Sequence, residues 1–336
     1  QIIKNFNNLI KKTIFKVQNK TNDNFNISGF NKYFIGFIAA LFIYLFYLLI
    51  PLLYEKTWLQ TNIENKLFNE FKINLSTSAE ISYRIIPAPH FIIKDSKIYT
   101  SNDKEKLIAE IKDFKIFLSQ GKFFDKEKMN IKKLVINGAN FSLLRSDLKL
   151  LNNFKNKKFS NKKIQINSSN IFFKDNFGEI ISIIKIDKTV AFFDDKKLLN
   201  FINLKGEVFN VPFNFNFQYQ NNSTKYQKID FSSKLLKLKL SNESTLEKKL
   251  ISGKSNISFL KSTIRTKYSV KDKLIFFKSD NSRLNNSQIS YDGVLSINPF
   301  DLNLNIDLDN YRISRLFNIN PILIEFINSR LLFNKN

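Results

Sequence analysis

A stretch of 21 residues without a charged side chain, from Tyr33 to Leu53, constrains the fold of this chain more than any other feature. At a rise of about 1.5 Å per residue, a helix of this length spans roughly 31 Å, which matches the hydrocarbon core of a bilayer. The stretch is longer than the apolar region of a signal peptide, and no small-residue cleavage motif follows it. It is therefore predicted to be an uncleaved transmembrane anchor, and its characteristic residues are Tyr33, Phe34, Phe37, Leu41, Phe46 and Leu53.

The charges on the two sides of this segment predict its orientation. Residues 1–32 carry a net charge of +5, whereas the charged residues of 54–72 balance. Short, positively charged flanks stay in the cytoplasm, so the N-terminus is predicted to be cytoplasmic. The bulk of the chain then lies across the membrane, which in a bacterium with two membranes is the periplasm. The lysines and apolar residues of 1–32 leave two interpretations open: a helix on an anionic membrane surface, or a leader that only sets topology.

The pattern beyond the anchor predicts a short helix followed by strands. Thr61-x-x-Glu64 is typical of a capping box, so a helix is expected to begin there and to end near Lys72. From about residue 75, apolar and polar residues alternate with a period of two, as in half-buried strands. The chain is thus predicted to divide into a basic segment (1–32), an anchor (33–53), a membrane-proximal helix (54–72) and a β-rich domain (73–336).

The clearest strand has one apolar and one polar face. Between residues 209 and 219 every second residue is apolar, and these residues are Phe209, Val211, Phe213, Phe215, Phe217 and Tyr219. Asn-Gly at 137–138 and Asp-Gly at 292–293 favour tight turns between strands, and therefore antiparallel pairing. A sheet with one apolar face must bury it against another layer or against lipid. The fold is predicted to be mainly β, with a long curved antiparallel sheet that forms either an open groove or a closed sandwich.

Composition narrows the possible chemistry. The chain has a net charge of +24, but its lysines are spread along strands, which is typical of a solvated strand face. An anionic-lipid role stays open, whereas nucleic-acid binding is disfavoured because the aromatic residues alternate with asparagine more than with lysine. There is no cysteine, and the single histidine, His90, is expected in a turn. No catalytic residue, metal ligand or cofactor motif is identified, and the protein is predicted not to be an enzyme.

Several short patterns follow the anchor in an order that is typical of one protein family. They are the stretches Ile63 to Leu67, Ile86 to Pro89, Phe91 to Ser96 and Met129 to Phe141 (MNIKKLVINGANF). In this order, the region from Trp58 to Arg145 resembles the N-terminal part of AsmA-like proteins. Lys72 departs from the pattern, because the family often has glycine after its first helix. The family's more C-terminal repeats are missing, which favours a fragment of a longer protein.

The resemblance implies a non-enzymatic protein of the bacterial inner membrane with a periplasmic β-groove. Such a protein moves phospholipid towards the outer membrane or otherwise supports that membrane. The expected partners are membrane phospholipid and, in the alternative reading, proteins that assemble outer-membrane proteins. On this expectation the alternating face of 209–219 lines the groove. The alternative is a closed β-domain with a structural role in that assembly.

Overall fold

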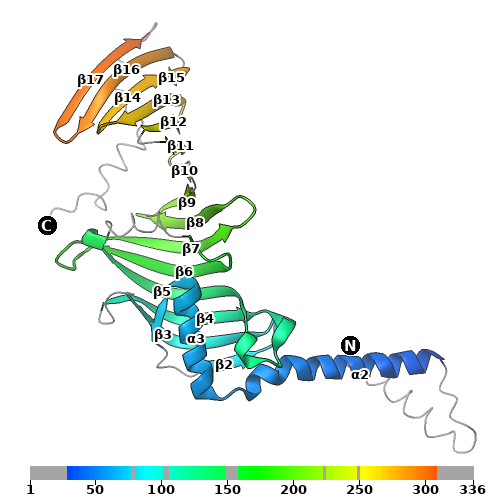
Figure 1. Ribbon diagram of the computed structural model, residues 1–336. Coiled ribbons are helices and arrows are strands. Elements are labelled where there is room, and N and C mark those ends of the chain that lie inside the picture. Colours follow the sequence, from blue (N-terminus) through cyan, green and yellow to red (C-terminus); the bar gives the residue numbers. More distant parts are fainter. Residues whose placement is uncertain are drawn as a thin grey trace, which may run out of the picture. The chain divides into compact units, whose positions relative to one another are not determined.

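A computed structural model of the chain describes residues 29–76, 81–100, 106–147, 158–221, 225–247, 250–285 and 287–308 (Figure 1). The predictions made for residues 1–28, and for the parts of the predicted β-rich domain at 148–157 and 309–336, concern residues outside these ranges. The chain divides into two compact units, 1–50 and 51–336, which are described separately.

The first unit contains most of the predicted anchor, whose last three residues, 51–53, belong to the second. Helix α2 runs from Gly29 to Leu49, and the 3₁₀ turn η1 (Ile50–Leu53) follows it. The segment Asn31–Leu53 is strongly apolar, and little of it is buried inside the structure. All six anchor residues singled out from the sequence are exposed. Among the described residues this is the one helix long and apolar enough to cross a membrane.

Helix α3 (Lys56–Phe71) opens the second unit and begins earlier than the sequence predicts. Thr61 lies inside the helix, where its hydroxyl donates to the carbonyl of Thr57 (3.1 Å), so the predicted capping box is wrong. The extended residue Glu55 precedes the first turn instead. The predicted end is confirmed, because Lys72 adopts a left-handed conformation (φ 57°) and donates its N–H to the carbonyl of Phe68 (3.0 Å).

Seventeen strands form one curved, mixed sheet, which confirms the mainly β fold with an anchor helix and a short second helix. The strands are β1 (Asn74–Ser76), β2 (Ile81–Arg84), β3 (His90–Tyr99), β4 (Leu107–Leu118), β5 (Ile131–Leu144), β6 (Lys163–Lys174), β7 (Ile180–Asp194), β8 (Leu199–Val208), β9 (Val211–Asn221), β10 (Lys225–Ser233), β11 (Leu238–Glu247), β12 (Leu250–Phe259), β13 (Ser262–Lys271), β14 (Leu274–Ser279), β15 (Ser282–Leu284), β16 (Ser287–Ile297) and β17 (Phe300–Leu308). Short 3₁₀ turns lie at Gln120–Lys122 (η2), Lys126–Lys128 (η3) and Arg145–Asp147 (η4).

The strands pair essentially in chain order, and Figure 1 shows this succession from β2 to β17. Both β1 and β2 pair with β3, and the short β15 lies between β13 and β16. All pairs are antiparallel except β5 with β6, which run parallel. The sheet is therefore mixed, because it contains this one parallel pair, whereas the sequence predicted antiparallel pairing throughout.

The parallel pair places equivalent asparagines side by side. The amide of Asn167 donates to the side-chain oxygen of Asn137 (2.8 Å), and the amide of Asn170 donates to that of Asn140 (3.1 Å). These two ladders join residues that stand directly opposite in the register. Because each amide both donates and accepts, such a ladder favours this register over a slipped one.

Two glycines predicted to lie in turns lie inside strands. Gly138 is in β5 with a φ of 65°, a backbone conformation that residues with a side chain rarely adopt. Gly293 is in β16, where a side chain would collide with the backbone oxygen of Asn303 and the ring of Phe277. Both positions need glycine for a reason other than chain reversal, so the two predicted turns are wrong.

Candidate functional site

One face of the sheet carries a continuous line of side chains that are apolar apart from one threonine. It emerges when directly paired residues are followed from strand to strand. Its twelve members, one from each of β2 to β13, are Ile81, Ile93, Phe114, Ile136, Ile166, Thr189, Leu204, Phe215, Phe231, Leu240, Ile257 and Ile264. At a strand spacing of about 4.8 Å, a row across these strands extends roughly 50 Å. We call this line the apolar row and its side of the sheet the apolar face.

The apolar face continues beyond β13 to the last described strand. Val270, which lies on the same face of β13 as Ile264, pairs with Ile275, which pairs with Leu295. Leu295 in turn pairs with Leu302 in β17. The one-sided pattern of individual strands therefore adds up to a single face across the whole sheet.

Cover over this face is confined to its first strands. Ile93, Phe114 and Ile136 have exposed fractions of 2% or less. Leu67 of α3 is also fully buried, and Glu70 of the same helix lies 3.2 Å from Lys162, just before β6. From β6 onward the members of the row are partly exposed, apart from the buried Thr189. In β17, Leu302 is 46% exposed. Within the described chain, helix α3 therefore covers only the first strands of the row, and most members from β6 onward are partly exposed to solvent.

The structure places five of the six predicted groove residues in β9. Phe215 belongs to the apolar row, and Val211, Phe213, Phe217 and Tyr219 lie on the same face of the strand. Phe209 does not belong to it. Phe209 and Asn210 form the two-residue turn between β8 and β9, both with positive φ, so the expectation for Phe209 is wrong.

Neighbouring members of the row were missed from the sequence. Leu204 lies in β8 and Phe231 in β10, and neither strand has a clear alternation of apolar and polar residues. The signal that could have found them is their position: each segment lies between turn residues and next to a strongly alternating strand. In a meander, such a segment must return antiparallel to its neighbour.

Part of the apolar face between β11 and β16 is polar but internally hydrogen bonded. The hydroxyl of Tyr268 donates to the side-chain oxygen of Asn242 (3.0 Å). The hydroxyls of Thr266 and Tyr291 are 2.6 Å apart. Because these polar groups bond to one another, their aromatic rings and methyl groups remain on the surface, and the face stays largely non-polar.

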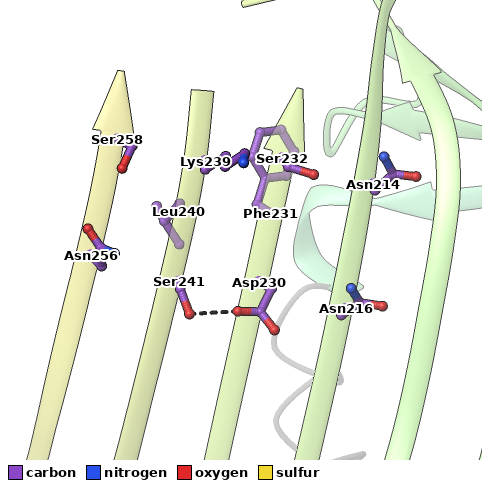
Figure 2. Close-up of a pocket in the computed structure, with 10 residues that line it drawn as sticks. All are labelled: Asn214, Asn216, Asp230, Phe231, Ser232, Lys239, Leu240, Ser241, Asn256 and Ser258. Atoms are coloured by element: carbon purple, nitrogen blue, oxygen red, sulfur yellow. Dashed lines mark hydrogen bonds between the residues drawn. The ribbon is translucent and has the colours of Figure 1, made fainter. Parts of the chain in front are cut away.

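The opposite face is polar, and two hollows lie on it among the described residues. The first, about 280 Å³, is lined mainly by short polar side chains of β9 to β12 (Figure 2). Figure 2 shows Asn214, Asn216, Asp230 and Ser241 along neighbouring strands, with a hydrogen bond from Ser241 to Asp230 (2.6 Å). The second, about 510 Å³, lies over β13 to β17. Both hollows therefore lie on the polar face, whereas the groove was expected on the apolar face.

His90 is the first residue of β3 and not part of a turn, as the sequence had suggested. It is 2% exposed, stacks on Phe117 at 4.8 Å, and its Nδ1–H donates to the carbonyl of Ala88 (2.7 Å). Burial lowers the pKa of His90, and the nearby positive charges of Lys115, Arg84 and Lys133 lower it further, while the bond to Ala88 acts in the opposite direction.

The lowered pKa of His90 predicts how stability depends on pH. Between the unfolded value of about 6.5 and the lower folded value, the unfolded chain binds the proton more readily, so stability falls as the pH decreases. We expect His90→Phe, which retains a ring beside Phe117, to remove this loss. Denaturant midpoints of both proteins at about pH 7 and about pH 5 measure it. An equal decrease in the two proteins would contradict the prediction.

Together these features define a mainly β protein with one candidate membrane-spanning helix and a long sheet that has a continuous apolar face. Comparisons with models of protein families, with curated proteins and with solved structures found no match to this chain. The resemblance to AsmA-like proteins therefore stays a prediction, carried by the order of the sequence motifs.

Proposed function

We propose that this chain is a non-enzymatic, membrane-anchored protein that carries phospholipid along its apolar face. In the proposal α2 is the single anchor in a bacterial inner membrane, the N-terminus is cytoplasmic, and the sheet extends through the periplasm towards the outer membrane. The acyl chains lie against the apolar row and the lipid headgroups stay in water.

The observation that supports this proposal is the apolar row itself. From β6 to β13 the row extends roughly 34 Å with mostly partly exposed members, and exposed apolar surfaces mark interaction sites. Each methylene transferred from water contributes about 0.8 kcal/mol, so acyl chains bind such a surface without any specific polar contact. Because the row has few polar members, a lipid at one strand meets a similar surface at the next.

The alternative function is a structural role in the assembly of outer-membrane proteins, performed by a closed β-domain. The buried residues of β3 to β5 under α3 favour a closed core in that part of the sheet. The partly exposed residues from β6 onward favour lipid as the covering layer. Phospholipid is accordingly the partner that we propose, and assembly proteins are the competing one.

Site-specific photocrosslinking tests the proposal on adjacent residues of one strand. A benzoylphenylalanine replaces either Phe231, which pairs with Phe215 on the apolar face, or its neighbour Ser232, which pairs with Asn214 on the polar face. The full-length protein is irradiated in cells, purified and analysed by mass spectrometry. We expect phospholipid adducts at position 231 and none at 232, because successive side chains of a strand point to opposite faces.

Two results would count against lipid carriage. Equal labelling at the two positions would mean that lipid contacts the sheet without regard to its apolar face. Protein adducts at 231 in place of lipid would favour the assembly role. The variant at Ser232 is a suitable control because it has the same probe, strand and expression background.

A further inference from the structure

A second membrane contact is suggested by the loop between β4 and β5 (119–130), which is joined to the end of the anchor segment. Leu53 is the last residue of the candidate span, and Tyr54 follows it directly. The hydroxyl of Tyr54 donates to the carbonyl of Phe123 in this loop (2.6 Å). The ammonium of Lys126 lies 5.1 Å from the ring centre of Trp58, in the first turn of α3. The loop therefore lies beside the point where the chain leaves the span.

The loop has a fixed shape that presents one apolar side chain outward. Phe123 and Met129 are each 1% exposed and hold its two halves against the protein. The N–H of Ser119 donates to the carbonyl of Asn130 (2.9 Å), which closes its base. Between these attachments, the ring of Phe124 is 83% exposed. A large apolar ring held outward on an anchored loop is suited to a second, non-aqueous phase.

Other exposed apolar residues gather at the same end of the sheet. Leu53 is 82% exposed, in the turn that precedes α3, and Ile86 is 84% exposed, in the loop before β3. That loop is joined to the end of β4 by a hydrogen bond from the N–H of Leu118 to the carbonyl of Pro89 (2.9 Å). Three separate segments thus bring apolar side chains to the region next to the span.

We propose that the 119–130 loop inserts Phe124 into the headgroup region of the bilayer that α2 crosses. The neighbouring residues have the chemistry of that region, because tyrosine and tryptophan prefer the membrane–water interface and lysine extends its ammonium into the headgroups. Tyr54, Trp58 and Lys126 would then form one interfacial cluster with Phe124. This inference rests on the membrane anchoring in the proposed function, but it does not depend on lipid transport.

The single tryptophan of the chain makes a direct test possible. In a Trp58→Phe background, tryptophan is introduced by Phe124→Trp or, as a control, by Phe177→Trp. Phe177 is 94% exposed in the turn between β6 and β7, at the opposite end of the β5–β6 pair from the loop. Each full-length protein is reconstituted into vesicles of phosphatidylethanolamine and phosphatidylglycerol, with or without bromine atoms near the top of the acyl chains.

We expect brominated lipid to remove most of the fluorescence of the Phe124→Trp variant and to leave the Phe177→Trp variant unchanged. Retention of the protein in the vesicles without quenching of the Phe124→Trp variant would overturn this inference alone. Equal quenching of both variants would also overturn it, because the contact would not be specific to the loop. Release of the full chain by an alkaline wash would overturn the anchor and this inference together. Lipid adducts at Phe231 report on the transport proposal separately.

Discussion

A single glutamate in place of Leu240 is expected to prevent lipid from passing the middle of the sheet. Leu240 stands in the apolar row between Phe231 and Ile257. A carboxylate at this point stays hydrated, so an acyl chain that crosses it must leave apolar contacts and displace bound water. A penalty of about 1.4 kcal/mol is enough for a tenfold decrease in occupancy, and a charge in an apolar path costs at least that much.

The measurement compares lipid adducts on the two sides of the substitution. Benzoylphenylalanine replaces Phe215, on the side of Leu240 towards the anchor, or Ile264, on the side away from it. In the Leu240→Glu protein we expect adducts at 215 to persist and those at 264 to fall about tenfold. This asymmetry is expected because the row is continuous and lipid enters from the anchored bilayer.

The matched control is the neighbouring residue on the other face. Lys239 is exposed and lines the polar hollow, so Lys239→Glu introduces the same carboxylate one residue away. We expect it to leave adducts at both probe positions unchanged. An equal decrease in both variants would indicate a general effect of charge, and an unchanged signal at 264 in Leu240→Glu would contradict passage along the row.

The second large effect is expected from Leu67→Ala in α3. Leu67 is fully buried, and truncation of a buried leucine typically costs 2–5 kcal/mol, which includes the cavity left behind. Because most contacts in this sheet are between neighbouring strands, the loss is expected to be local, as in repeat proteins. Hydrogen exchange is expected to accelerate in β3 to β5, and to stay unchanged in β11 to β13, where the row is already partly exposed.

Phe68→Ala provides the comparison for this experiment. Phe68 is the next residue of the same helix and is 44% exposed. Its truncation removes more atoms than that of Leu67 but less buried surface, and it leaves no enclosed cavity, so we expect a smaller change in exchange. Faster exchange throughout the sheet in Leu67→Ala would contradict a local effect of α3. Similar effects of the two variants would contradict the inference that Leu67 helps α3 to cover the first strands of the apolar row.

Sequence patterns predicted the elements best where the period was strong. Five of the six alternating residues predicted between 209 and 219 lie in β9, and the helix end at Lys72 is confirmed. The predicted start of α3 is wrong, because a threonine that matches the capping pattern can also lie inside a helix. There its hydroxyl donates to the backbone carbonyl four residues earlier, as Thr61 does to Thr57. Gly138 was assigned to a turn because Asn-Gly is typical of tight turns, and only the pairing of β5 with β4 on both sides of Gly138 shows that the strand continues through it.

Local sequence by itself determined that an uncharged segment long enough to cross a bilayer precedes a series of strands with one apolar face each. These properties depend on composition and on the two-residue period of a strand. The tertiary structure decided that the separate faces join into one row and that the α3 layer covers only its beginning. Both depend on register between strands and on packing across layers, which are set by contacts between residues far apart in the chain.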